Sequence, residues 1–498
     1  MNGSPLRSPS RLVLVLGGTL GLLLVVLAPG WFGGADEGTH FMRSLAMANG
    51  QIFPDRVDGA LISTVPVAQS ESVGAVIRAA SHQDAPNTGA LLADLLETHP
   101  DWNDTVGFDT GSTMASSPVA YAPSALFMAI PNALDAPTIV TLWFGRLGDL
   151  VVYLALVLLA LRLAGAFRWA IAITALLPMN LAMAASVSPD AVTIGALLLV
   201  VALWTRLWRD TDPTTSLAKT EETGEVACGD AEPVSVLRQA LIIGGAGLLL
   251  ALAKPPYFAV LAAFPALLLV RRRDGRVQTA AIASTIALAA GVVASVFSTS
   301  NDYRSAGAGM FAELRFQPEV QTDRILDAPF AFLWRCIARW FEAVPDSVQR
   351  WTRQLGIWQS SLPSVVAWLI VITFIVAAIT LDAEDLLRLR RFCRIIFAIG
   401  TALIVLALMA SSYIYFDDTD DGVHMTEQIA RYSLPLFAMA IMGWAPRWPL
   451  RVRRLAFVST DRWRSAMVAS VAAGTTICVA AVVVEWWWPG VAGKFTGY

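Results

Sequence analysis

Four residues of types used in catalysis stand close together in the segment ADEGTHFMR: Asp36, Glu37, His40 and Arg43. If a helix begins near Asp36, residues 36, 40 and 43 share one face, because side chains three and four positions apart are neighbours. An acid, an imidazole and a guanidinium would then project together. A structural interpretation is also open, in which the two acids complement the helix dipole and Arg43 extends toward the membrane surface.

Further polar groups stand at the ends of apolar stretches. Asp190 ends the turn Ser-Pro-Asp, Lys254 and Tyr257 frame the turn Lys-Pro-Pro-Tyr, and Arg431 and Tyr432 open a late apolar stretch. Ionisable groups near a membrane are costly unless they are used, so each is a candidate for a site. The simpler alternative is that the first two are proline turns, with Asp190 as a helix cap.

Two other groups of charges have structural explanations. Arg146 and Asp149 are three residues apart within one apolar stretch, which predicts an ion pair that locks helices together. The acids Asp417, Asp418, Asp420 and Asp421 could hold a divalent cation, although a solvated loop is the simpler interpretation. We leave the metal requirement open.

The composition shows which elements must position these residues. Of the 498 residues, 56% are apolar and 15% are charged, whereas soluble domains have roughly 45–50% and 25%. This excludes secreted enzymes and cytosolic dehydrogenases. The formal net charge of −3 gives no reason to expect a nucleic-acid partner. The four cysteines lie far apart without metal-ligand spacing, which argues against disulfides and zinc.

We predict an all-α integral membrane protein with about 11 transmembrane helices, because a bilayer needs about 20 apolar residues per helix. The predicted spans are 12–29, 137–161, 169–187, 190–208, 238–253, 257–270, 277–297, 364–381, 395–415, 433–447 and 466–485. The first resembles a signal peptide, but no clean cleavage site follows before Trp31, so we interpret it as a retained anchor. Lys and Arg gather in alternate loops, which predicts a cytoplasmic N-terminus.

The whole chain, 1–498, is predicted to form a single polytopic membrane domain. Two long loops, 30–136 and 298–363, then lie outside; the first carries the acidic motif, and the tryptophans and arginines of the second predict amphipathic helices at the membrane surface. The polar segment 210–234 is expected to be a disordered cytoplasmic linker. All the candidate residues except Arg146 and Asp149 fall at the outer ends of spans.

The segment ADEGTHFMRSLAMANG resembles the DE-x2-H-x2-R signature of the domain of unknown function 2142 family of bacterial multi-pass membrane proteins. Further stretches agree with the family in the same order: SSPVAYAPSALF, SVSPDA, AKPPY, LGIWQSSLP and ARYSLPLF. The resemblance covers about residues 31–436. The chain departs from the family pattern where GADE replaces the usual proline before the acids and where Gln428, Ile429 and Ala430 replace a Gln-Gly element.

The family is similar to the GT-C superfamily of integral-membrane glycosyltransferases, which place an acidic motif in the first outer loop and use polyprenyl-phosphate sugars. The resemblance implies a GT-C-like fold in the bacterial cytoplasmic membrane. It also implies transfer of a sugar from a polyprenyl-phosphate-linked donor to a cell-envelope glycan or lipid acceptor on the outer face.

The residues suit this chemistry. Sugar transfer passes through an oxocarbenium-like state, with a hydroxyl to deprotonate and a phosphate charge to neutralise. We assign Asp36 as general base, Glu37 as its helper or a metal ligand, and His40 as an orienting group. The donor phosphate would be held by Arg43, Lys254 and Arg431, with Asp190, Tyr257 and Tyr432 lining the same substrate site.

Two other classes of function stay open. In a transporter or flippase of lipid-linked precursors, the same charges would form a substrate relay, although such a site is expected near the bilayer midplane. In a non-catalytic envelope-assembly protein, Asp36 would be exposed to solvent and would lie far from Lys254 and Arg431. The sequence does not identify the donor sugar, the acceptor, the stereochemical outcome or the oligomeric state.

Overall fold

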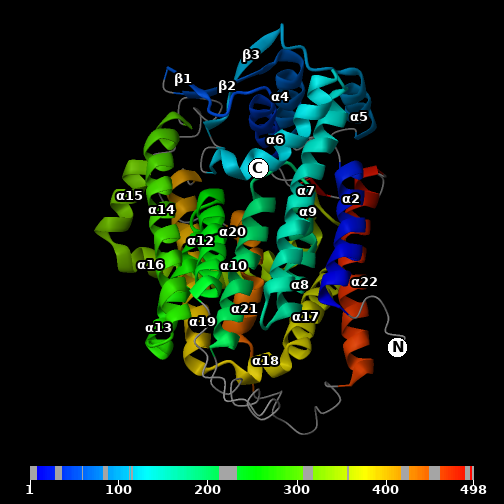
Figure 1. Ribbon diagram of the computed structural model, residues 1–498. Helices are drawn as coiled ribbons and strands as arrows, with labels where there is room; N and C mark the ends of the chain where they lie inside the picture. Colours follow the sequence, from blue (N-terminus) through cyan, green and yellow to red (C-terminus); the bar gives the residue numbers. More distant parts are fainter. Residues whose placement is uncertain are drawn as a thin grey trace.

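The protein is described from a computed structural model that covers residues 8–28, 36–58, 60–81, 88–111, 113, 116–211, 233–306, 318–355, 358–416, 426–447, 460–487 and 494–495. The predicted linker 210–234 and the four acids at 417–421 lie largely or wholly outside these residues. The described chain is mostly helical, and its long helices run side by side in one bundle (Figure 1). The expected helical class is therefore confirmed.

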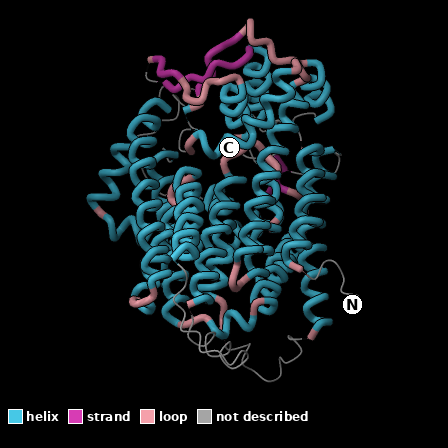
Figure 2. Tube along the Cα trace, viewed as in Figure 1, coloured by secondary structure: helices cyan, strands magenta, loops and turns pink. Residues whose placement is uncertain are grey.

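The segment between α2 (Gly18–Leu27) and α7 (Thr138–Leu163), predicted to be the first outer loop, forms a cap over one end of the bundle (Figure 1). Its elements are α3 (Glu37–Ala48), β1 (Asp55–Val57), β2 (Ala60–Pro66), α4 (Val67–Ser81), α5 (Thr88–Glu97), β3 (Thr105–Asp109) and α6 (Pro118–Ala133). The strands form an antiparallel sheet in the order β1-β2-β3 (Figure 2). The all-α prediction was wrong here: β2 alternates outward and inward side chains, with Leu61, Ser63 and Val65 buried, a periodicity typical of strands.

The bundle contains the remaining elements. Its first half holds α1 (Pro9–Leu12), η2 (Val13–Gly17), α2 (Gly18–Leu27), α7 (Thr138–Leu163), α8 (Arg168–Leu176), α9 (Pro178–Ala184), α10 (Asp190–Asp210), α12 (Pro233–Ala253), η4 (Tyr257–Ala262), α13 (Ala263–Arg271) and α14 (Gly275–Ala306). Its second half holds α15 (Pro318–Asp327), α16 (Pro329–Arg353), β4 (Gln354–Leu355), β5 (Trp358–Gln359), α17 (Ser364–Leu381), α18 (Ala383–Arg388), α19 (Arg391–Phe416), α20 (Thr426–Ser433), η5 (Leu434–Leu436), α21 (Phe437–Trp444), α22 (Asp461–Trp487) and β6 (Lys494–Phe495).

Within the described residues, eight helices are long and apolar enough to cross a membrane, so the chain is a membrane protein. They are Pro9–Leu27, Thr138–Leu163, Asp190–Asp210, Val236–Ala253, Gly275–Val296, Ser364–Leu381, Arg391–Ile414 and Asp461–Trp487. Each coincides with one of the predicted spans. The α10 span is 94% buried inside the protein and therefore forms the centre of the bundle, while the other seven are 28–50% buried.

The predicted count of eleven is not confirmed, because the spans at 169–187, 257–270 and 433–447 are interrupted. Pro178 separates α8 from α9, since a residue before proline is pushed out of the helical region. The second segment begins as the 3-10 helix η4 after two prolines, and the third contains the 3-10 helix η5 at Pro435.

The segment predicted to be the second outer loop contains an amphipathic helix, α16. Its apolar side chains stay on the protein surface: Phe330 is 84% exposed, Trp334 70% and Phe341 67%. Aromatic residues exposed in this way are typical of a helix that lies in the headgroup region of a membrane. A short antiparallel sheet, β4-β5-β6, follows it.

Candidate functional site

Asp36 precedes α3 in an unusual backbone conformation. Its φ angle is 61°, in the left-handed region that Asp and Asn tolerate better than most residues. The side chain makes no capping hydrogen bond to the helix, so the interpretation of Asp36 as a cap is not supported. Instead, its Oδ2 lies 3.4 Å from Nη2 of Arg431, and 41% of the Asp36 side chain is exposed. The structure therefore directs this carboxylate toward the end of α20.

Glu37, the second acid of the motif, is fully buried and bound to Arg146 of α7. The guanidinium donates from Nε to Oε1 at 2.8 Å and from Nη2 to Oε2 at 2.7 Å. The N–H of Val187 also donates to Glu37, and Arg146 Nη1 donates to the carbonyl of Ala28. This network joins α3 to α7 and to the ends of α2 and α9.

The ion pair predicted between Arg146 and Asp149 is wrong, because Glu37 takes the guanidinium in a two-point contact. Such fork-to-fork geometry is stronger than a single contact. Asp149 instead accepts a hydrogen bond from the N–H of Ser188 at 3.1 Å. A spacing of three residues within one helix did not reveal a partner that stands more than a hundred positions away.

Lys254 and Asp190 form a second ion pair in the same region. Lys254 Nζ lies 2.7 Å from Asp190 Oδ1, and the two side chains are only 16% and 11% exposed. Burial by itself lowers the pKa of Lys254, but the adjacent Asp190 carboxylate outweighs it and holds the pKa above its usual value. Lys254 is therefore a cation at neutral pH.

Tyr432 lies between the two cations. Lys254 Nζ is 4.2 Å from the centre of the Tyr432 ring, and the Arg431 guanidinium carbon is 4.7 Å from it. Arg431 Nη2 donates to the Tyr432 hydroxyl at 2.6 Å, and the buried Tyr257 donates to the Tyr432 carbonyl at 2.7 Å. Arg431 is 16% exposed. Two positive charges therefore share one aromatic ring, a favourable cation–π arrangement.

His40 stands one turn after Asp36 and is held by Tyr121 of α6. The Tyr121 hydroxyl lies 2.9 Å from His40 Nδ1 and donates to the carbonyl of Thr113 at 3.1 Å. A hydroxyl has one proton, so His40 Nδ1–H must donate to Tyr121, and Nε2 carries the lone pair. Burial lowers the pKa of His40 to about 4, although the neighbouring Asp36 raises it. His40 is thus neutral at pH 7.

We expect His40 to make the protein less stable as the pH falls. The unfolded chain binds this proton with the ordinary pKa of 6.5, whereas the folded chain binds it at about 4. Protonation therefore favours unfolding between pH 6.5 and 4. The melting temperature of wild type relative to His40→Gln should be constant above pH 6.5, decline toward pH 4 and then level off. A difference that does not change across this window would show that His40 titrates normally.

Arg43 is the last residue of the predicted motif, and its side chain is buried away from the cluster around Tyr432. The side chain is 1% exposed, donates from Nη2 to the carbonyl of Ile52 at 3.2 Å, and places its guanidinium carbon 5.9 Å from the Tyr121 ring centre. It therefore supports Tyr121 and the turn after α3. The sequence predicts that Arg43 binds the donor phosphate, whereas these contacts favour a positioning role.

The nine predicted residues thus divide into two groups. Six come together from the residue before α3, the start of α10, the turn before η4, the start of η4 and the end of α20: Asp36, Asp190, Lys254, Tyr257, Arg431 and Tyr432. His40 lies close enough to this cluster to interact electrostatically with Asp36. Glu37 and Arg43 hold the surrounding elements in position. Within the described part of the chain, no group of three His, Cys, Asp or Glu side chains could hold a metal ion.

A family model described as "Predicted membrane protein (DUF2142)" matches residues 19–440. The chain belongs to this family. Comparisons with curated proteins and with solved structures gave no match. All nine predicted site residues of this DUF2142 member lie within the matched range, whereas α22 lies beyond it.

The sequence did not reveal the roles of two residues of this DUF2142 site, Tyr121 and Arg146. Tyr121 was visible only as the tyrosine of the YAP stretch that resembles the family, and its bond to His40 depends on α6 packing beside α3. Arg146 was noticed but paired wrongly. The available signal was the pair of adjacent acids itself. Successive helix residues point in different directions, so if Asp36 faces the site, Glu37 is directed elsewhere and needs a cation to neutralise it.

Proposed function

We propose that this DUF2142 protein is a membrane glycosyltransferase that transfers a sugar from a polyprenyl-phosphate donor to an envelope glycan or lipid acceptor. One observation carries the proposal. A partly exposed carboxylate, Asp36, lies 3.4 Å from the guanidinium of Arg431, with the Lys254 ammonium on the same tyrosine ring. A proton acceptor therefore stands beside two cations, the combination that a phosphate leaving group and an attacking hydroxyl require.

The proposed reaction is a single displacement. The acceptor hydroxyl oxygen bonds to the anomeric carbon of the sugar, and its proton passes to the Asp36 carboxylate. The bond between the anomeric carbon and the phosphate oxygen breaks, and polyprenyl phosphate leaves with the electron pair. Arg431 and Lys254 neutralise the charge that develops on the phosphate. Inversion at the anomeric carbon follows from one displacement.

The ion pairs have to open for the donor to bind. The contact between Arg431 and Asp36 is long at 3.4 Å, so little is lost when a phosphate oxygen replaces the carboxylate. The pair of Lys254 and Asp190 is shorter and more buried, which suits a cation that stays in place. Glu37 is better assigned as a positioning residue than as a helper base or metal ligand, because Arg146 and Val187 occupy its oxygens.

Arg431→Ala and Lys254→Ala should each weaken donor binding by roughly 10- to 100-fold, because a charge-assisted hydrogen bond contributes about 1.5–3 kcal/mol. Binding is measured with a panel of radiolabelled polyprenyl-phosphate hexoses and pentoses. Arg339→Ala is the matched control, since Arg339 is 46% exposed and pairs only weakly with its neighbour Glu342. Equal binding by all three variants would exclude a phosphate site around Tyr432.

The proposal places the site on the outer face of the bacterial cytoplasmic membrane, with eleven passes and a cytoplasmic N-terminus. Support comes from the interrupted segment formed by α8 and α9, whose two ends contact opposite ends of the bundle. Phe167, before α8, donates to Asp385 of α18, whereas Val187, after α9, donates to Glu37 under the cap. Interrupted helices are tolerated in membranes where they are buried in protein, and every residue of α8 and α9 after Arg168 is buried.

Reporter fusions test this topology. Fusions at residues 100 and 330 should report the outside, and a fusion at residue 385 should report the cytoplasm. A cytoplasmic signal at residue 100 would put the cap on the wrong face for an outer-face transferase.

A transporter or flippase would need charged groups along a path for the substrate near the bilayer midplane. Arg146 lies deeper than the cluster around Tyr432, but it is held in a structural network and so does not support this alternative. A non-catalytic assembly protein is disfavoured by the contact between Asp36 and Arg431. The fate of a labelled donor distinguishes all three functions.

A further inference from the structure

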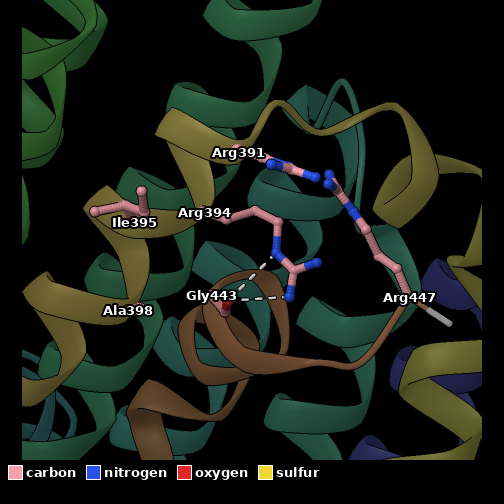
Figure 3. A pocket seen from close by; sticks show the side chains of 6 residues that line it. All are labelled: Arg391, Arg394, Ile395, Ala398, Gly443 and Arg447. Atoms are coloured by element: carbon pink, nitrogen blue, oxygen red, sulfur yellow. Dashed lines mark hydrogen bonds between the residues drawn. The ribbon is translucent and has the colours of Figure 1, made fainter.

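A cavity of about 420 Å³ lies at the end of the bundle opposite the β1-β2-β3 sheet (Figures 1 and 3). Its lining residues come from the start of α19 and the end of α21: Arg391, Arg394, Ile395, Ala398, Gly443 and Arg447. Half of these residues are arginines, and none is acidic. The cavity is thus a concentrated positive site far from the cluster around Tyr432.

Two of the arginines are fixed by backbone carbonyls. Arg394 donates to the carbonyls of Gly443 and Ala445 at the end of α21, and Arg447 Nε donates to the carbonyl of Leu386 at 2.9 Å. Gly443 allows α21 to pack closely against α19, because a Cβ atom there would lie 2.6 Å from the backbone nitrogen of Ala398. These guanidinium groups are therefore held in place before any ligand arrives.

Arg391 has no comparable partner among the described residues. It makes no hydrogen bond or ion pair within the part of the chain that the structure describes. Figure 3 shows its guanidinium pointing toward that of Arg447, with Arg394 beside them. Charges of the same sign repel one another, and the first turn of α19 contains no acidic residue to offset the positive helix end. An anion in the cavity would relieve both effects.

The neighbouring surface indicates what carries the anion. Ile395 lines the cavity and is 53% exposed, and Ile399 and Leu403 follow at intervals of four residues with exposures of 54% and 57%. Residues four apart form a continuous stripe along a helix. Because α19 is long and apolar enough to cross the membrane, this stripe faces acyl chains. The cavity therefore opens where a lipid headgroup would meet the protein.

We propose that the cavity binds the phosphate group of an anionic membrane lipid, whose acyl chain lies along Ile395, Ile399 and Leu403. Planar guanidinium groups bind phosphate oxygens in a two-point manner. Clusters of arginines at the cytoplasmic end of a membrane helix are a known form of lipid-headgroup site. This site is independent of the proposed sugar transfer.

The test uses the purified full-length chain and native mass spectrometry. Phosphatidylglycerol should bind about tenfold or more tightly than phosphatidylcholine of the same acyl length. Arg391→Gln should reduce phosphatidylglycerol binding by about tenfold, since it removes one charge-assisted contact. Arg388→Gln is the matched control, because that side chain is 66% exposed, lies at the same end of the bundle and does not line the cavity.

The proposal is overturned if the two lipids bind alike, or if Arg391→Gln and Arg388→Gln behave alike. Inorganic phosphate that binds as tightly as phosphatidylglycerol would overturn the lipid as the source of the phosphate. If Arg391→Gln does not fold, Arg391→Lys keeps the charge and should retain part of the preference for phosphatidylglycerol. A Lys variant without any such preference would contradict the proposal as well.

Discussion

Replacing Asp36 with asparagine is expected to lower the rate of sugar transfer by a factor on the order of 10² to 10⁴, with little loss of donor binding. Asparagine keeps the size of the side chain and tolerates the left-handed backbone at φ 61°, but it cannot accept the proton. Transfer of label from a polyprenyl-phosphate sugar is measured in membranes, with donor binding measured in parallel.

Asp58→Asn provides the matched control for this variant. Asp58 is also left-handed, with a φ angle of 49°, and it is exposed in the turn between β1 and β2. The same chemical change there should leave transfer unaltered. Full activity in Asp36→Asn would mean that Asp36 is not the base.

Glu37→Gln is expected to destabilise the protein by about 3–5 kcal/mol, because it leaves the buried Arg146 without a counter-charge. This is a large part of the stability of most folded proteins, roughly 5–15 kcal/mol. The purified variant should unfold at a much lower temperature, or fail to accumulate in membranes. Glu342→Gln, which breaks the exposed pair with Arg339, should cost about 0–1 kcal/mol.

The double variant Glu37→Gln with Arg146→Gln sharpens the interpretation. Removing both charges avoids an unpaired buried ion, so the double variant should be more stable than Glu37→Gln alone. A Glu37→Gln protein that melts like wild type but transfers no sugar would instead give Glu37 a role in catalysis. Substitutions of the two adjacent acids are therefore expected to have different effects: Asp36→Asn lowers the rate of transfer, and Glu37→Gln lowers the stability of the fold.

The sequence predicted the long helices well, because a run of about 20 apolar residues has few alternatives to a membrane-spanning helix. It also predicted that Asp36, Lys254 and Arg431 would meet, since all three stand at ends of apolar stretches on the same side. Successive loops of a membrane protein alternate between two faces, so residues far apart in the sequence can lie near one another on the same face.

Other features depended on tertiary packing and could not be read from local patterns. The choice of Glu37 rather than Asp149 as the partner of Arg146 follows from how α3 seats on α7. The interruptions at Pro178 and Pro435 are stable only because neighbouring helices cover them. The left-handed backbone at Asp36 likewise has no signature in the sequence, although it decides where the carboxylate points.

Sugar transfer breaks the bond between the sugar and the phosphate of the donor, whereas transport leaves this bond intact. The most direct measurement is the fate of a donor labelled in the sugar, incubated in proteoliposomes with wild type or Asp36→Asn and with bacterial envelope glycans and lipids as acceptors. The proposal predicts that wild type moves the label to an acceptor and releases free polyprenyl phosphate, whereas Asp36→Asn binds the donor and leaves it intact. A donor that crosses the bilayer unchanged with both proteins would contradict the proposal and establish transport instead.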